Sequence, residues 1–193
     1  KIIALLAMTM KEKGRLDGDT AVVTVMSNLG FIKYMESQGI NTEKTAVGDR
    51  YVYENMKEND YVLGGEQSGH IIFRKYAHTG DGLITALMLM EVMMETQLPL
   101  SVLASSVSMY PQVLKNVRVD DKDATLSDSA VQAAVDECTA ALGDSGRVLL
   151  RKSGTEPVLR VMAEAGTAEE CEKWVDHIIT AMEKSGHLIE VKK

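Results

Sequence analysis

The first 109 residues alternate between short β-branched or apolar runs and segments in which apolar residues recur at helical spacing. Helical periodicity covers residues 2–14, 29–38, 49–58 and 81–96, and strand-like runs cover 20–26, 41–47, 61–64 and 71–73. Strands that alternate with helices of this length are typical of an α/β layer structure. The pattern therefore predicts an α/β/α domain with a mixed, mainly parallel sheet.

The order of elements changes after residue 109. Two of the three prolines lie between Pro99 and Pro111, and this stretch is the predicted domain boundary. Beyond it we expect strands over 112–119, 147–150 and 158–165 and helices over 126–141 and 168–184. This order predicts a small α+β domain, residues 110–193, with an antiparallel sheet covered by helices on one face. Because the chain opens with Lys1 inside a helical pattern, without an initiator Met, we expect the first domain, residues 1–109, to be N-terminally truncated.

Composition argues against several classes of protein. The 21 basic and 28 acidic residues give a net charge of −7 without a basic segment, which argues against nucleic-acid binding. The longest apolar runs, 2–8 and 86–90, are too short to span a membrane, and no signal peptide is visible. Cys138 and Cys171 are interpreted as reduced thiols, so a cytoplasmic location is expected. The four histidines lack metal-ligand spacing and are interpreted as structural or surface residues.

The loop between the runs 148–150 and 158–161 is the most informative segment. It reads R-K-S-G-T-E-P, over 151–157, and Arg160 follows in the next predicted strand. A guanidinium group, hydroxyl donors and a glycine that lets the backbone come close are what a phosphate dianion needs. A polar hairpin with a charged rim explains Lys152 and Glu156 equally well. It explains Arg151 and Arg160 less well, since both flank the loop and can converge on one point.

Four further segments lie beyond predicted strands, where open α/β sheets bind ligands. In G-G-E-Q-S-G-H, 64–70, an extended backbone would point Glu66 and Ser68 the same way, toward a sugar diol; a glycine-rich hairpin with a solvated Glu is the alternative. Asp49 in T-A-V-G-D-R-Y, 45–51, is expected to cap a helix or contact a ligand. Helix capping also accounts for T-G-D-G, 79–82, and for Ser27-Asn28.

Standard nucleotide, zinc-protease and serine-hydrolase signatures are absent. The acidic segment 120–123 follows a strand without glycine spacing and is interpreted as a solvated turn.

Taken together, six strings in this order carry a family resemblance: T-V-M-S-N-L-G-F (24–31), V-G-D-R-Y-V (47–52), G-E-Q-S-G-H (65–70), T-G-D-G-L (79–83), Y-P-Q-V-L-K-N-V-R-V (110–119) and R-K-S-G-T-E-P-V-L-R-V-M (151–162). They resemble the C-terminal half of the bacterial phosphoglucosamine mutase family, within the α-D-phosphohexomutase superfamily. The resemblance spans essentially the whole chain and implies the third and fourth of four domains.

The resemblance implies two sets of binding residues. Sugar hydroxyls would contact Glu66 and Ser68, with Gly48, Asp49 and Arg50 lining the same cleft. The substrate phosphate would be held by Arg151, Ser153, Gly154 and Thr155, with Lys152 and Arg160 as weaker candidates. No catalytic residue and no metal ligand is expected in this chain.

The implied family reaction interconverts glucosamine 6-phosphate and glucosamine 1-phosphate through a phosphoserine and a bisphosphate intermediate, and feeds UDP-N-acetylglucosamine and cell-wall synthesis. Mg²⁺ serves that reaction, but the phosphoserine loop and the D-G-D-x-D-R metal loop are not in this sequence. We therefore expect this chain alone to bind sugar phosphates without mutase activity, and a parent enzyme that is compatible with a homodimer. A phosphomannomutase or phosphoglucomutase of the same superfamily, and a non-catalytic sugar-phosphate-binding module, remain alternatives.

Overall fold

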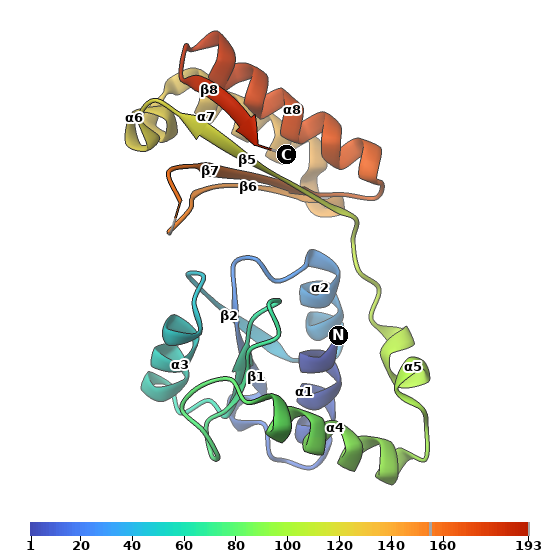
Figure 1. Ribbon diagram of the computed structural model, residues 1–193. Helices are drawn as coiled ribbons and strands as arrows, with labels where there is room; N and C mark the ends of the chain where they lie inside the picture. Colours follow the sequence, from blue (N-terminus) through green and yellow to red (C-terminus); the bar gives the residue numbers. More distant parts are fainter. Residues whose placement is uncertain (155, 193) are drawn as a thin grey trace. The chain divides into compact units, whose positions relative to one another are not determined.

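The computed structural model describes residues 1–154 and 156–192. It divides into two compact units, unit 1 (Lys1–Met109) and unit 2 (from Tyr110 onward), each with its own sheet and core (Figure 1).

Unit 1 is an α/β/α layer structure built on sheet A. Its elements are α1 (Ile2–Glu12), β1 (Thr20–Thr24), α2 (Leu29–Ser37), β2 (Asn41–Thr45), α3 (Asp49–Glu58), β3 (Leu63–Gly65), β4 (Ile71–Phe73), α4 (Gly82–Thr96) and α5 (Leu100–Leu103). The strand order is β2-β1-β3-β4; β1 runs parallel to β2 and β3, and β4 is antiparallel to β3. The prediction of a mixed, mainly parallel sheet is confirmed.

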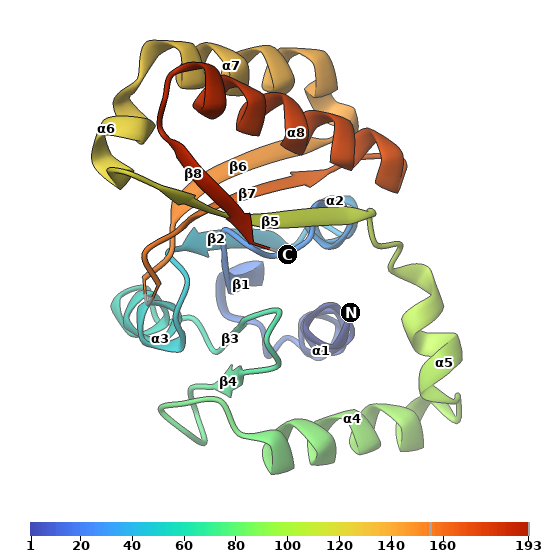
Figure 2. The ribbon, with the colours of Figure 1, turned by 45° about the horizontal axis from the view of Figure 1, so that its top comes forward.

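Alternate residues of β1 explain why helices cover both faces of sheet A. Ala21 and Val23 belong to the core that includes α1 and α2, whereas Val22 packs with Val52 and Met56 of α3 on the other face. Successive strand residues point to opposite faces, so a strand that is apolar throughout needs cover on both. Figures 1 and 2 show α3 and α1 on either side of the strands.

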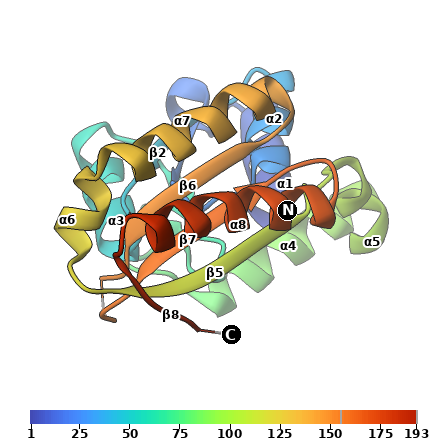
Figure 3. The same ribbon diagram turned by 90° about the horizontal axis from the view of Figure 1, so that it is seen from above.

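Unit 2 is an antiparallel sheet B with helices on one face. Its elements are β5 (Gln112–Val119), α6 (Lys122–Ser127), α7 (Ser129–Leu142), β6 (Arg147–Lys152), β7 (Leu159–Glu164), α8 (Ala168–Lys184) and β8 (Leu188–Lys192). The strand order is β6-β7-β5-β8, and every pair is antiparallel. Leu159, Val161 and Ala163 of β7 belong to the core that includes residues of α7 and α8. Figure 3 shows these two helices over the sheet. The predicted α+β class is confirmed.

Three expectations for unit 2 were wrong in detail. The helix expected over 126–141 is two helices, because Asp128 has extended backbone angles (φ −64°, ψ 127°) and caps α7 by accepting hydrogen bonds from Ala130 and Val131. The acidic segment 120–123 is not a solvated turn, since Asp121 caps α6 through the backbone N–H groups of Asp123 and Ala124. Strand β8 was not expected; it pairs with β5 at the edge of sheet B.

Among the described residues, no single helix has the length and apolar character needed to cross a membrane. The stretch made of α4 and residues 100–106 meets both criteria, but only as a pair bent by 92°.

Candidate functional site

Three loops of unit 1 meet beyond the carboxyl ends of the parallel strands. They connect β2 to α3, β3 to β4, and β4 to α4. Glu66 Oε1 accepts a hydrogen bond from the backbone N–H of Gly48 at 2.9 Å, and Thr79 Oγ1 donates to Asp49 Oδ2 at 3.2 Å. Side chains from the second and third loops therefore hold the first, at the edge where open α/β sheets bind ligands.

The loop that carries Glu66 and Ser68 is a tight turn. Gly69 N–H donates to the carbonyl of Glu66 (3.1 Å), and Glu66 N–H donates to the carbonyl of His70 (2.9 Å). Our premise that an extended backbone points Glu66 and Ser68 the same way was wrong. Ser68 Oγ lies 3.1 Å from His70 Nδ1, whereas the Glu66 carboxylate turns to Gly48 and is more than a solvated hairpin charge.

The segment Gly48-Asp49-Arg50 begins helix α3. Gly48, at φ 137°, is the residue before the helix, and Asp49 is its first residue, so Asp49 does not cap α3 as one interpretation expected. Arg50 is 80% exposed and its Nε lies 2.7 Å from Glu54 Oε1 on the same helix. Capping is confirmed for the two other strand-end motifs: Asn28 accepts from Gly30 N–H, and Asp81 accepts from Ile84 N–H.

Two glycines allow close backbone approach around the β3–β4 turn. A Cβ on Gly65 would lie 2.5 Å from the carbonyl oxygen of His70, and one on Gly80 would lie 2.9 Å from the Cα of His70. Both obstacles are backbone atoms, which move only if the turn moves. Gly65 thus allows close packing within the β3–β4 turn, and Gly80 allows the loop before α4 to pack against that turn.

A cavity of about 160 Å³ lies beside the same turn in unit 1. Its polar lining comes from Ser27, Asn28, Glu66 and Gln67, and Phe31 and Ile71 supply apolar walls. A small cavity with a few polar groups on an apolar wall suits a polar organic ligand.

The loop between β6 and β7 of unit 2 brings two arginines together. Arg151 and Arg160 are direct partners in the β6–β7 register, so their side chains leave the same face of sheet B, opposite α7 and α8. The shared face is what convergence of the two guanidinium groups requires, and their convergence on one phosphate stays a prediction. Burial, followed by the positive charge of Arg160, lowers the pKa of the Arg151 guanidinium.

Other side chains of this loop are held by the protein. Ser153 is buried, and its Oγ accepts the backbone N–H of Glu156 at 3.2 Å while keeping its own proton to donate. Lys152 pairs with Asp123 of α6. A Cβ added to Gly154 would meet nothing within 4 Å, so the backbone there is open to approach. The predicted phosphate contact Thr155 lies outside the described residues.

The electrostatics of this loop favour an anion. Like charges directly opposite on neighbouring strands repel each other, and on the Arg160 side a 3.4 Å ion pair with Glu156 offsets part of that repulsion. A dianion between the guanidinium groups would relieve the repulsion and accept bidentate hydrogen bonds. The arrangement is therefore suited to binding one phosphate group.

The structure offers no comparable arrangement for a metal ion. Within residues 1–154 and 156–192, no three His, Cys, Asp or Glu side chains are grouped so that they could hold one. Cys138 and Cys171 are free and buried, and burial raises the pKa of the Cys138 thiol to about 11. Burial also raises the pKa of Cys171, so neither thiol is activated as a nucleophile at neutral pH.

Comparison with known proteins agrees with the two-unit division. The model of the phosphoglucomutase/phosphomannomutase α/β/α domain III matches residues 1–110, and that of the phosphoglucomutase/phosphomannomutase C-terminal domain matches residues 114–181. The chain belongs to this phosphohexomutase family. Each unit therefore has its own counterpart domain in this family.

Close relatives are phosphoglucosamine mutases. The chain is 54% identical to that of Lachnospira eligens over 188 residues, covering 97% of this chain and 42% of the relative. It is 55% identical to that of Oceanobacillus iheyensis over 184 residues, covering 95% and 41%. The chain thus spans about two fifths of the curated relatives that it matches.

Solved structures share the fold. The N-acetylphosphoglucosamine mutase of Aspergillus fumigatus matches with a TM-score of 0.78 at 21% identity, over 96% of this chain and 43% of that one. A second structure of that enzyme, in complex with GlcNAc-6P and magnesium, matches with a TM-score of 0.76 at 21% identity, over 94% of this chain and 46% of that one.

Proposed function

We propose that this chain supplies the sugar-binding and phosphate-binding parts of a phosphoglucosamine mutase. The parent enzyme would interconvert glucosamine 6-phosphate and glucosamine 1-phosphate through a phosphoserine and a bisphosphate intermediate. Relatives of that name, 54% and 55% identical over nearly the whole chain, favour this substrate over the glucose and mannose phosphates of other family members.

The observation that carries the proposal is the cross-strand pair of Arg151 and Arg160. Two guanidinium groups on one face, beside the buried hydroxyl of Ser153, form a site for one phosphate. The site holds the phosphate that is not reacting. In a reaction whose intermediate binds in two orientations, one fixed clamp serves either end of the sugar, and it affects the rate through positioning.

The three loops of unit 1 provide the sugar contacts. Because Glu66 Oε1 is fixed by Gly48 N–H, its second carboxylate oxygen has a set direction and can accept a sugar hydroxyl. Ser68 adds a hydroxyl from the tip of the same turn. Structures of the related Aspergillus fumigatus enzyme have been solved with glucose 1,6-bisphosphate and with GlcNAc-6P, which supports a ligand of this class.

The chain alone should bind without turnover. Its described residues do not fit a Mg²⁺ ion, and the sequence has no phosphoserine loop of the family type. We therefore assign the metal, which acts as Lewis acid in this chemistry, and the phosphoryl donor to the rest of the parent enzyme. The family's role in UDP-N-acetylglucosamine supply would place that enzyme in the cytoplasm, and a homodimeric parent stays a prediction.

The test is a titration of the isotope-labelled chain with inorganic phosphate and with glucosamine 6-phosphate, followed by amide shifts. Shifts should centre on residues 151–160 for phosphate and include 48–50 and 66–70 for the sugar phosphate. Arg151→Ala should weaken phosphate binding by about 1.5–3 kcal/mol, because it removes a charge-assisted contact.

Lys184→Ala is the matched control. It removes one positive charge from the exposed end of α8, on the helical side of sheet B, and should leave phosphate affinity unchanged. Equal affinities of the wild type and Arg151→Ala would refute the phosphate assignment. Mutase turnover by the purified chain with Mg²⁺ and bisphosphate would refute the claim that it only binds.

A further inference from the structure

Two complementary polar atoms of unit 2 are buried without a hydrogen-bond partner. In the described part of the chain, three side-chain atoms have this status: Asn55 Oδ1, Asn116 Oδ1 and Arg160 Nε. Asn116 and Arg160 are direct partners in the β5–β7 register. A buried acceptor and a buried donor therefore lie on neighbouring strands, on the face of sheet B that also carries Arg151.

Two buried polar atoms without partners lower the stability of unit 2 unless they form a hydrogen bond in another state of the protein. Each buried polar atom has lost its hydrogen bonds to water without a replacement. Cβ atoms of directly opposite residues are about 4.5–5.5 Å apart, so changes in side-chain torsions can bring Nε–H of Arg160 to Oδ1 of Asn116. In this structure the Arg160 side chain is instead directed toward Glu156, with Nη2 3.4 Å from Oε2, which is long for a charged pair.

We propose that Asn116 is a positioning residue for the phosphate site. Its Oδ1 accepts a hydrogen bond from Nε–H of Arg160 when an anion replaces Glu156 as the partner of the guanidinium group. With Nε fixed by Asn116, both Nη groups face the loop and form the planar fork that binds a phosphate through two hydrogen bonds. Glu156 and Asn116 thus hold Arg160 in two alternative states, without and with ligand. This inference rests on the proposed phosphate function.

The change of Arg160 from Glu156 to a bound phosphate is energetically favourable. A phosphate dianion attracts the guanidinium more strongly than the half-exposed Glu156 carboxylate does, and it also relieves the repulsion from Arg151. Releasing Glu156 costs little, because exposed ion pairs contribute little to stability. The new Nε–Oδ1 bond satisfies two buried atoms at once.

The decisive readout is the Nε–H signal of Arg160 in the labelled chain, together with phosphate affinity. In the wild type, inorganic phosphate should shift this signal and slow its exchange with water several-fold. Asn116→Leu, similar in size but without an acceptor, should abolish the slowing and weaken phosphate binding about tenfold. Glu156→Gln should tighten phosphate binding several-fold, since the ligand-free state loses its ion pair.

Asn55→Leu is the matched control. Asn55 also carries an unpartnered buried Oδ1, but it lies on α3 of unit 1, so its replacement should leave both readouts unchanged. Should Asn116→Leu fail to fold, Asn116→Asp replaces it. A carboxylate there should slow Arg160 Nε–H exchange even without phosphate.

The outcomes separate this inference from the proposed function. If phosphate binds, Arg151→Ala weakens it and Asn116→Leu changes neither readout, the role of Asn116 is wrong and the phosphate site stands. The role of Asn116 is equally wrong if Asn116→Asp leaves the Nε–H signal unaltered. If the wild-type chain does not bind phosphate, both the role of Asn116 and the phosphate site fall.

Discussion

The two candidate sites are held together by different physics. In unit 1, backbone turns and hydrogen bonds from uncharged donors to the Glu66 and Asp49 carboxylates join three loops, and Glu66 is already engaged by Gly48. In unit 2, two like charges face each other across β6 and β7, and a buried donor of Arg160 is unpartnered. A site for sugar hydroxyls gains from being preformed, whereas a clamp for a dianion can keep electrostatic strain that the ligand relieves.

Gly65→Ala tests the steric dependence of the unit 1 site and should have the largest effect. The added methyl would lie 2.5 Å from the carbonyl oxygen of His70, so we expect a loss of about 3 kcal/mol in the unfolding free energy of unit 1. Thermal or denaturant unfolding measures it. Gly82→Ala, where a Cβ meets nothing within 4 Å at the start of α4, is the control and should be neutral or slightly stabilising. If the two variants were equally stable, close backbone packing at Gly65 would not be what holds the unit 1 site.

Arg147→Ala tests how much the stability of unit 2 depends on an ion pair outside the β6–β7 loop. Glu164 is fully buried and receives hydrogen bonds from Arg147 Nε (2.7 Å) and Gln112 Nε2 (2.6 Å). Removing Arg147 leaves a buried carboxylate with weaker compensation, so unit 2 should lose about 2 kcal/mol, less than a fully buried pair because Arg147 is partly exposed. Chemical denaturation checks this value. The double variant with Glu164→Gln should recover part of the loss, and additive effects would argue against coupling between the pair.

Inorganic phosphate should stabilise unit 2 and leave unit 1 unchanged. At a concentration ten times the dissociation constant, binding to the native state alone adds about 1.4 kcal/mol. Amide hydrogen exchange distinguishes the units, since slowing should be confined to strands such as β7 and absent from β1. Slowing of the same size in Arg151→Ala would show that the stabilisation is a general salt effect.

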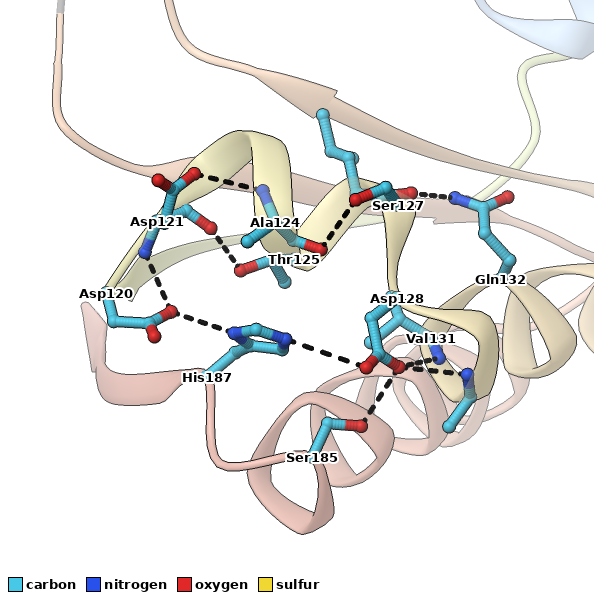
Figure 4. A network of polar contacts seen from close by, with 12 residues as sticks. Asp120, Asp121, Ala124, Thr125, Ser127, Asp128, Val131, Gln132, Ser185 and His187 are labelled. Carbon is cyan, nitrogen blue, oxygen red and sulfur yellow. Dashed lines mark hydrogen bonds and ion pairs between the residues drawn. The ribbon is translucent and has the colours of Figure 1, made fainter.

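The smallest expected effect is a pH dependence of the stability of unit 2, which arises from the protonation of His187 (Figure 4). Its Nδ1 lies 2.9 Å from Asp120 Oδ1 and its Nε2 3.6 Å from Asp128 Oδ2. The hydrogen bond with Asp120, then the charges of both carboxylates, raises the pKa of His187 above its ordinary 6.5. Stabilisation from the protonated ring is therefore complete below pH 6.5 and is lost as the pH rises through the raised value.

The carboxylates give the opposite slope at low pH. His187 lowers the pKa of Asp120, and the N–H of Val131 lowers that of Asp128, below the ordinary 3.8. Their contribution is present above pH 3.8 and falls away below it, so this network favours unit 2 most between about pH 4 and 6.5. Melting temperatures across pH check this window. His187→Gln should flatten the decline above pH 6.5, and an unchanged profile would contradict the role of His187.

The sequence predicted the strand and helix order of unit 1 because most of its helices begin or end next to a glycine or a capping residue, such as Asn28, Gly39, Gly48 and Asp81. Unit 2 was predicted less fully. Strand β8 has only a short apolar pattern and forms because β5 offers it an edge, and the break at Asp128 depends on a cap rather than on periodicity. Asp49 was predicted as a possible cap, whereas backbone geometry gives that place to Gly48.

The sequence by itself determined the two-domain composition, the family and the residue types of both sites, since these follow from periodicity and short motifs. Tertiary structure decided which atoms meet. Only the turn at 66–69 sends Glu66 to Gly48, and only the strand register sets Arg160 between Arg151 and Asn116. The physical reason is that motifs and periodicity are local properties of the sequence. Contacts between residues such as 116 and 160 depend instead on how strands that are distant in the sequence pair.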